Sequence, residues 1–175
     1  PSQSCVGCNA FFSTAGGPVT WSGSPGLTFS TPFGPNTNVS FPISATTNTY
    51  TITGTGAAGV YCNSPVSAFI VVAPRPVLTI LPASAIACPN TPVTFVATST
   101  VTTTPINWVL PGGATMIANS GPQLDTAVIS FATIPVGGVT VTATQNCAFN
   151  LSCSQGTASV TVKKPQAPNL ATPPS

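Results

Sequence analysis

The stretch Val71-Val72-Ala73-Pro74-Arg75-Pro76 decides how this chain of 175 residues is divided. Pro74 and Pro76 cannot donate a hydrogen bond to a β-ladder, and each favours an extended conformation in the residue before it. An apolar run that ends in Pro-x-Pro is therefore typical of the last strand of a domain followed by a stiff linker. A similar run, Val160-Thr161-Val162-Lys163-Lys164-Pro165, occurs about 90 residues later and indicates a tandem repeat.

Other motifs recur in the same order at nearly constant spacing. The matching pairs and their spacings are Trp21 and Trp108 (87 residues), Gly34-Pro35 and Gly121-Pro122 (87), Val39-Ser40-Phe41 and Ile129-Ser130-Phe131 (90), and Tyr50-Thr51-Ile52-Thr53 and Val139-Thr140-Val141-Thr142 (89). Insertions in loops produce a small drift of this kind. The run Val77–Leu81 precedes Cys88 and is expected to form a first strand, whereas only residues 1–7 precede Cys8, so the first domain is expected to lack this strand.

These repeats predict two domains. We expect a first sandwich at residues 1–73, a linker at 74–76, a second sandwich at 77–164 and a proline-rich linker to a following module at 165–175. Because the chain opens on Pro1 in the middle of a repeat, we interpret it as a mature or excised piece of a longer secreted protein.

Both domains are expected to consist of short strands, because apolar or alternating runs are separated by turn residues. In Thr49-Tyr50-Thr51-Ile52-Thr53 the apolar side chains share one face, as in a half-buried antiparallel strand. No stretch shows a helical period. The fold class is therefore all-β: two tandem immunoglobulin-like antiparallel sandwiches. The predicted strands are residues 9–14, 18–22, 27–30, 38–43, 49–55 and 66–72, then 77–81, 93–98, 106–110, 115–118, 127–132, 139–144 and 158–162.

Charged residues make up 2% of the chain, against about 25% in an average protein. They are Arg75, Asp125, Lys163 and Lys164, and there is no histidine. A nucleic-acid or anionic-membrane surface needs clustered cations, so neither partner is expected. The longest apolar run, residues 68–73, is far shorter than the roughly 20 residues of a membrane span.

This composition also argues against an enzyme. One carboxylate and no histidine exclude paired-carboxylate hydrolysis and Ser/His/Asp chemistry. Asp125 alone cannot supply the oxygen ligands of a calcium site. We therefore expect no catalytic residues, no metal site and no cofactor.

Six cysteines fit an oxidising compartment and predict structural disulfides. They fall three to a repeat and are Cys5, Cys8, Cys62, Cys88, Cys147 and Cys153. The pair Cys5-x-x-Cys8 resembles half a zinc site, but no second pair of ligands completes it. A redox CxxC motif normally lies in a thioredoxin-like context with a helix, which this sequence does not show.

The second repeat carries a family resemblance. It runs through Cys88-Pro-Asn, Val93-Thr-Phe95, Asn107-Trp108-Val-Leu-Pro111-Gly112 and Gly138-Val-Thr-Val141 to Asn146-Cys147. This pattern resembles the PKD-like, immunoglobulin-like repeats of the large surface adhesins of gliding Bacteroidetes, which are secreted by the type IX route. The resemblance implies an extracellular, cell-surface location and a role as a spacer or adhesive stalk.

The resemblance also implies one disulfide in each domain. It pairs Cys88 with Cys147 or Cys153, and Cys62 with Cys8 or Cys5, and we favour this pattern. In an immunoglobulin-like strand order these positions lie at opposite ends of a sandwich, beyond the 7 Å or so that a bridge allows between Cα atoms. Two alternatives therefore stay open: a bridge between Cys147 and Cys153, and bridges from Cys5 or Cys8 into the last loop of the next domain.

The sequence supports three hypotheses about function. The first is a non-catalytic adhesin or stalk segment whose partners are neighbouring repeats, other surface proteins or glycans. The second is a subunit of a surface filament assembled by strand complementation, which the missing first strand would permit. The third is a glycan-binding module that uses Trp21 and Trp108, although the sandwich core is the favoured place for both. Asp125-Thr126-Ala127 is similar to the O-glycosylation consensus of Bacteroidetes, which makes Thr126 a candidate acceptor.

Overall fold

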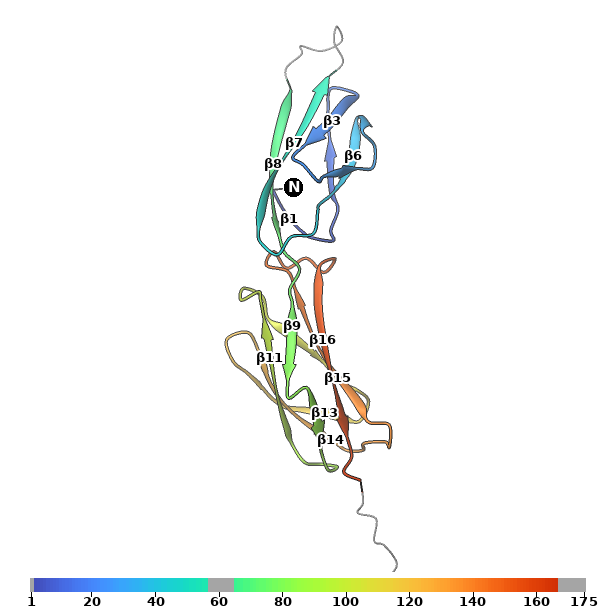
Figure 1. Ribbon diagram of the computed structural model, residues 1–175, viewed down its shortest axis with the longest axis vertical. Coiled ribbons are helices and arrows are strands. Elements are labelled where there is room, and N and C mark those ends of the chain that lie inside the picture. The colour runs from blue at the N-terminus through green and yellow to red at the C-terminus, as the bar shows by residue number, and fades with distance from the viewer. Residues whose placement is uncertain (1, 57–64, 167–175) are drawn as a thin grey trace, which may run out of the picture. The chain divides into compact units, whose positions relative to one another are not determined.

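The computed structural model describes residues 2–56 and 65–166, and the chain forms two compact units (Figure 1). The first unit comprises Pro1–Val77, Thr100–Thr104 and Gln145–Gly156; the second comprises Leu78–Ser99, Pro105–Thr144 and Thr157–Ser175. The described residues contain strands and no helix, so none of them forms a helix that could cross a membrane. Residues 100–104 and 145–156 fall within the range expected for the second sandwich, but their contacts group them with the first unit.

The first unit is built from two sheets. One has the strand order β1-β8-β7-β3-β5 and the other has the order β2-β6-β4. Strand β1 runs parallel to β8, whereas β7 pairs antiparallel with β8 and β3, β3 with β5, and β6 with β2 and β4. The strands are β1 (Gln3–Cys5), β2 (Ala10–Ser13), β3 (Val19–Gly23), β4 (Thr28–Phe29), β5 (Phe33–Gly34), β6 (Asn36–Ser40), β7 (Asn48–Gly56) and β8 (Val66–Ala73).

The second unit also has eight described strands, divided four and four between its two sheets. Its sheets have the orders β10-β16-β15-β12 and β13-β14-β11-β9. Strand β10 runs parallel to β16, as β1 does to β8, and a bulge interrupts the pairing of β13 with β14. The strands are β9 (Leu78–Leu81), β10 (Ser84–Ile86), β11 (Val93–Ser99), β12 (Ile106–Val109), β13 (Ala114–Ser120), β14 (Thr126–Phe131), β15 (Val139–Asn146) and β16 (Gln155–Lys163).

These strand orders are those of an immunoglobulin-like sandwich, in which the first, second, fifth and fourth strands face the third, sixth and seventh. The prediction of two tandem all-β sandwiches of this type is confirmed. The short strands β1, β5 and β10 were not predicted, because two or three residues are too few to show an alternation.

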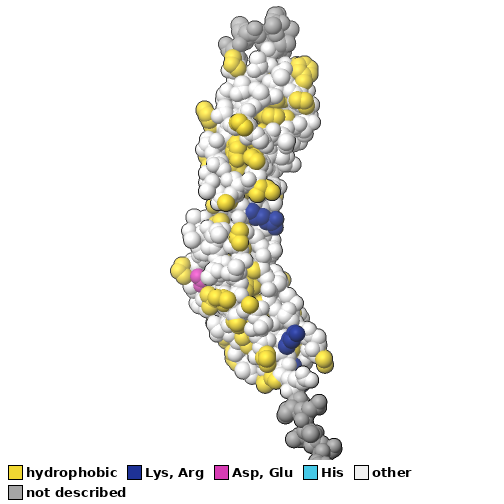
Figure 2. Space-filling model, viewed as in Figure 1, with side chains coloured by type: hydrophobic (Ala, Val, Ile, Leu, Met, Phe, Trp, Pro, Cys, Tyr) yellow, Lys and Arg dark blue, Asp and Glu magenta, His cyan; other side chains and the backbone are white. Residues whose placement is uncertain are grey.

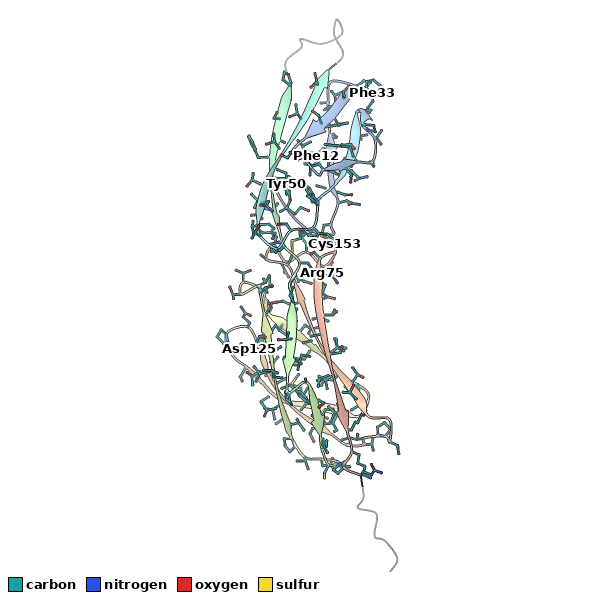
Figure 3. All side chains as sticks on the ribbon, viewed as in Figure 1. Phe12, Phe33, Tyr50, Arg75, Asp125 and Cys153 are labelled. Atoms are coloured by element: carbon teal, nitrogen blue, oxygen red, sulfur yellow. A yellow bond between two sulfur atoms is a disulfide. The ribbon has the colours of Figure 1, made fainter. Side chains whose placement is uncertain are left out.

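Each unit has its own apolar core. In β7, Tyr50 and Ile52 are buried while Thr49 is exposed, so the alternation read in the sequence sets the inner face. Phe12 and Tyr50, both labelled in Figure 3, belong to the core of the first unit. In the second unit Phe95, Phe131 and Ile129 are among the largest fully buried side chains.

Candidate functional site

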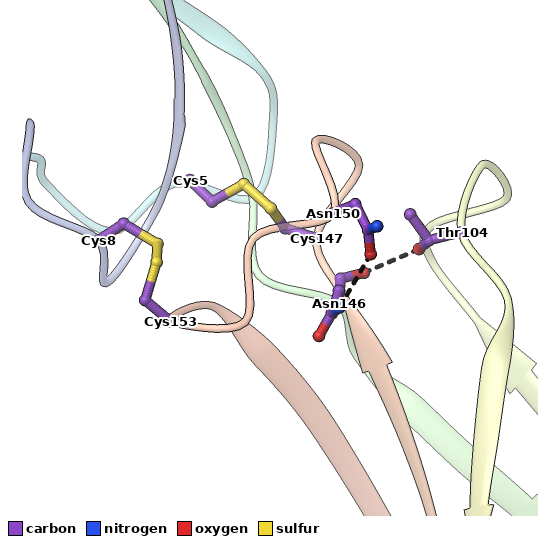
Figure 4. The surroundings of a disulfide bond; sticks show 7 residues. All are labelled: Cys5, Cys8, Thr104, Asn146, Cys147, Asn150 and Cys153. Carbon is purple, nitrogen blue, oxygen red and sulfur yellow. Dashed lines mark hydrogen bonds between the residues drawn. A yellow bond between two sulfur atoms is a disulfide. The ribbon is translucent and has the colours of Figure 1, made fainter. Parts of the chain in front are cut away.

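Two disulfides anchor the loop between β15 and β16 in the first unit (Figure 4). Cys5 is bonded to Cys147 and Cys8 to Cys153, with Cα atoms 6.4 and 5.4 Å apart. Both distances lie in the normal range for a disulfide. The bridged positions are 142 and 145 residues apart in sequence, so the two bonds close very long loops.

Local structure presents Cys5 and Cys8 to this loop. Parallel pairing sets Cys5 opposite Ala73, at the end of β8, and the N–H of Val6 donates to the carbonyl of Ala73 at 3.0 Å. The N–H of Cys8 then donates to the carbonyl of Cys5 at 3.0 Å, which closes a tight turn. Gly7 lies in this turn with φ +91°, a left-handed conformation that favours glycine.

The loop that carries Cys147 and Cys153 is held by its own hydrogen bonds. The N–H of Asn150 donates to the carbonyl of Cys147 at 2.8 Å, and the N–H of Cys147 donates to the carbonyl of Ser154 at 3.1 Å. The Nδ2 atom of Asn146 donates to Oδ1 of Asn150 at 2.9 Å. The loop is therefore an ordered turn rather than a loose connection.

The segment at residues 100–104 completes this part of the first unit. Thr104 Oγ1 donates to the carbonyl of Asn146 at 2.8 Å. Gln145 is 1% exposed, and its Nε2 atom donates to the carbonyls of Val101 and Thr104 at 3.0 and 2.6 Å. A buried amide that bonds two backbone carbonyls removes the penalty that those groups would otherwise incur.

The disulfide pairing favoured from the resemblance is wrong. Cys88 lies near the end of β16, because the N–H of the neighbouring Ala87 donates to the carbonyl of Lys163. Cys147 lies near the start of β16, because its N–H donates to the carbonyl of Ser154. The 9 residues of β16 span about 30 Å at roughly 3.3 Å per residue. That is far beyond the 7 Å or so that a bridge allows between Cα atoms.

The open alternative, bridges from Cys5 and Cys8 to the last loop, is the arrangement that occurs. It also excludes a bridge between Cys147 and Cys153, and a bridge from Cys62 to Cys5 or Cys8. Cys62 itself lies outside the described residues. Among the described residues Cys88 is a free, exposed cysteine.

An open sheet edge is the second feature of the first unit. In the second unit β9 pairs with β11 at the edge of the sheet and buries Leu78 and Ile80. In the first unit, the strand that corresponds to β11 is β2. Strand β2 pairs with β6 on one side and has no partner on the other within residues 2–56 and 65–166. The described part of the first unit thus has no counterpart of β9.

A small apolar cavity lies behind this edge. Its volume is about 100 Å³, and Phe12, Trp21, Ile52 and Val66 are among the side chains that line it. Val66 is 73% exposed. Strand β1 pairs only with residues 71–73 of β8. In the described chain, the first half of β8 therefore has no strand partner on the side away from β7.

Both tryptophans lie inside the cores. Trp21 is 7% and Trp108 is 8% exposed. Trp21 Nε1 donates to the carbonyl of Gly34 at 3.0 Å, and Trp108 Nε1 donates to that of Leu124 at 2.9 Å. Neither ring offers an open face to a sugar, so these residues do not form a stacking platform for a glycan.

Thr126 begins β14, in the interior of its sheet, and is half-buried. Its Oγ1 donates to Oδ1 of Asp125 at 3.2 Å. Asp125 is labelled in Figure 3. The hydroxyl that a glycan would modify is thus part of a local hydrogen bond with the carboxylate of the same motif.

A surface groove of about 480 Å³ lies beside the bridges, and Phe41, Ile43, Arg75 and Cys153 contribute to its lining. The Nε atom of Arg75 donates to the carbonyl of Gln155 at 2.6 Å. No cluster of three or more His, Cys, Asp or Glu side chains that suits a metal ion occurs in the part of the chain that is described. The groove therefore offers one cation and mostly apolar walls.

The surface of the described residues carries scattered apolar side chains and few charges. Figure 2 shows one face, on which uncharged groups predominate and charged side chains are sparse. Phe11, Phe33 and Phe69 of the first unit are 55%, 59% and 67% exposed. Phe11 lies between the buried residues Ala10 and Phe12 and so falls on the outer face of its strand, whereas Phe33 and Phe69 each have one buried neighbour, Gly34 and Ile70.

Comparison with known proteins finds similar solved structures. No protein-family model and no curated protein matches the chain. Over 93% of its length the chain is similar to a chain in the complex of Dpr2 Ig1-Ig2 with DIP-Theta Ig1-Ig3, at 12% identity and a TM-score of 0.35. It is also similar to the N-terminal four Ig domains of Dscam1 isoforms 6.44 and 4.44, at 12% and 10% identity and TM-scores of 0.35 and 0.37. The chain spans 60%, 43% and 42% of these three chains.

Proposed function

We propose that this chain is a non-catalytic spacer segment of a large adhesin or stalk on the surface of a bacterial cell. The observation that carries the proposal is the succession of two immunoglobulin-like sandwiches, with an ordered loop held by Cys5–Cys147 and Cys8–Cys153. Disulfides persist in oxidising compartments, which supports an extracellular location.

The finer assignment rests on the sequence motifs of the second unit. Their resemblance to the PKD-like repeats of gliding Bacteroidetes supports secretion by the type IX route and a place among the adhesins of those cells. Neighbouring repeats of the parent protein are then the nearest partners, and other surface proteins or glycans are the adhesive ones. The surface is almost without charge, so such contacts rely on apolar groups and hydroxyls rather than on ion pairs.

Surface labelling of intact cells tests this proposal. An antibody raised against the purified chain is expected to label unpermeabilised cells of the bacterium that makes it. A strain without the type IX route is expected to lose that label while it keeps the protein inside the cell. Labelling that requires permeabilisation in both strains would contradict the extracellular role.

The open edge of β2 favours a second candidate, a subunit of a filament assembled by strand complementation. An extended segment from another molecule can add to a sheet edge through main-chain hydrogen bonds. The internal repeat suggests the character of that segment, because β9 covers the matching edge of the second unit with Leu78 and Ile80. Light scattering over a wide range of concentration tests this candidate. If the chain forms filaments, its mean mass is expected to grow with concentration; a constant monomer mass would exclude the filament.

A further inference from the structure

The two disulfides change the route by which a pull on the ends of the chain is transmitted. Cys5 and Cys8 lie at and just after β1, and Cys147 and Cys153 lie just before β16. The shortest covalent path through the described chain therefore runs along β1, crosses a disulfide and continues along β16. Residues 9–146 form closed loops that lie off this path.

We infer that tension applied to the two ends of the chain is carried by β1, the disulfides and β16, and bypasses the rest of both sandwiches. This result follows from covalent connectivity, so it holds for any arrangement of the two units. It goes beyond the proposed spacer role, because it is a mechanical property of the isolated chain and does not depend on an adhesive partner.

The two strands on this path, β1 and β16, can lengthen very little under tension. A β-strand already rises about 3.3 Å per residue, close to the limit of an extended chain. A pull on both ends of β16 therefore stretches the strand along its own axis. The strands paired with it, β10 and β15, are attached to it without being in line with the tension.

There are two bridges, and they differ in exposure: both cysteines of the Cys5–Cys147 bond are buried, whereas Cys153 of the Cys8–Cys153 bond is exposed. Cys5 and Cys147 are 0% exposed and Cys8 is 5% exposed, packed in a small cluster with Ala73. Thiol–disulfide exchange requires access to a sulfur atom, so the Cys5–Cys147 bond is shielded from reductants while the chain is folded. If the Cys8–Cys153 bond is lost, the Cys5–Cys147 bond still takes residues 6–146 off the path.

Single-molecule pulling tests this inference. The whole chain is held through peptide tags at its two ends, with no cysteine handles, under oxidising conditions. The oxidised chain is expected to show no unfolding event that releases tens of nanometres. A variant that combines Cys5→Ser, Cys8→Ser, Cys147→Ser and Cys153→Ser is expected to release up to about 50 nm, because the separation of 142 residues corresponds to that length at about 3.6 Å per residue.

Matched variants separate the roles of the two bonds. Cys8→Ser with Cys153→Ser, and Cys5→Ser with Cys147→Ser, each leave one bridge, and both are expected to behave as the oxidised wild type does. Cys88→Ser controls for thiol chemistry outside the bridges and is expected to have no effect. Release of tens of nanometres by the oxidised wild type would overturn the inference.

A measurement on the wild type alone covers the case in which the four-serine variant does not fold. The oxidised chain is held at constant tension while a reductant is added. Stepwise lengthening that totals up to about 50 nm is expected only after that addition. Lengthening of that size before the reductant arrives, or none after both bridges are shown by mass spectrometry to be reduced, would contradict the inference.

Discussion

The residues that place the tightest limits on this fold include glycines as well as core side chains. Gly121 precedes β14 with φ +92°, in the left-handed region, and a side chain at this position would collide with the Asp125 carboxylate. Gly137 differs in both respects: it has no heavy atom within 4 Å of the place of a Cβ, and its φ lies outside that region. The same Gly→Ala substitution at the two positions therefore compares a constrained glycine with an unconstrained one.

Gly121→Ala is expected to lower the free energy of unfolding by about 2 kcal/mol, because alanine incurs the left-handed backbone penalty and the Asp125 carboxylate must move. Gly137→Ala is expected to be neutral, or to stabilise by up to about 1 kcal/mol through the unfolded state. Urea unfolding followed by tryptophan fluorescence measures both. Equal effects of the two substitutions would show that the Gly121 backbone is not constrained as described.

Gln145 tests the buried amide beside the disulfides. Gln145→Leu keeps the size of the side chain but leaves the carbonyls of Val101 and Thr104 without the bonds that Nε2 provides. Each such loss costs about 1–3 kcal/mol, so a destabilisation of roughly 2 kcal/mol or more is expected. Thr140→Val, at an exposed position of the same strand, is the control and is expected to change stability by less than about 0.5 kcal/mol. Urea unfolding of both variants decides the matter, and a shift no larger than that of the control would contradict this role.

At the scale of elements, the two units differ most at one sheet edge. The Thr14 N–H donates to the carbonyl of Pro35 on the side of β6. Because successive residues of a strand direct their N–H groups to opposite sides, the N–H of Phe11 points away from β6, to the open edge. The side chain of Phe11 is 55% exposed, so neither group is needed for the core.

Phe11→Pro is expected to prevent strand addition at β2 and to leave the fold intact, because proline is tolerated where a strand N–H faces solvent. Phe11→Ala is the control, since it removes the ring and keeps the N–H. If the chain associates through this edge, light scattering should show the mass falling to that of the monomer in Phe11→Pro and not in Phe11→Ala. Equal behaviour of the two variants would place any association elsewhere.

At the scale of the whole molecule, the chain achieves its fold with almost no charge. Its charged residues are Arg75, Asp125, Lys163 and Lys164. Screening acts on interactions between charges, so there is little for salt to weaken. The melting temperature is expected to change little between low salt and about 1 M NaCl, apart from the mild effect of salt on apolar burial. Calorimetry at the two salt concentrations checks this, and a large loss of stability on adding salt would reveal an electrostatic network.

The sequence by itself determined the class of fold. The alternation of apolar and hydroxyl side chains in runs such as Thr49–Thr53 depends on the two-residue period of a strand, which is a local property. The repeated proline junctions and the recurring tryptophans likewise indicated two related sandwiches. The same composition indicated a module without catalytic chemistry.

Tertiary structure alone decided the disulfide pairing. The partners Cys5 and Cys147 are 142 residues apart, and whether their Cα atoms come within bonding distance depends on how β1 ends beside β8 and where the loop before β16 lies. Strand periodicity carries no information on either point, because it is set by neighbours one or two positions away in the chain. The pairing, and the path of tension that it creates, therefore became visible only when segments distant in the sequence were placed side by side.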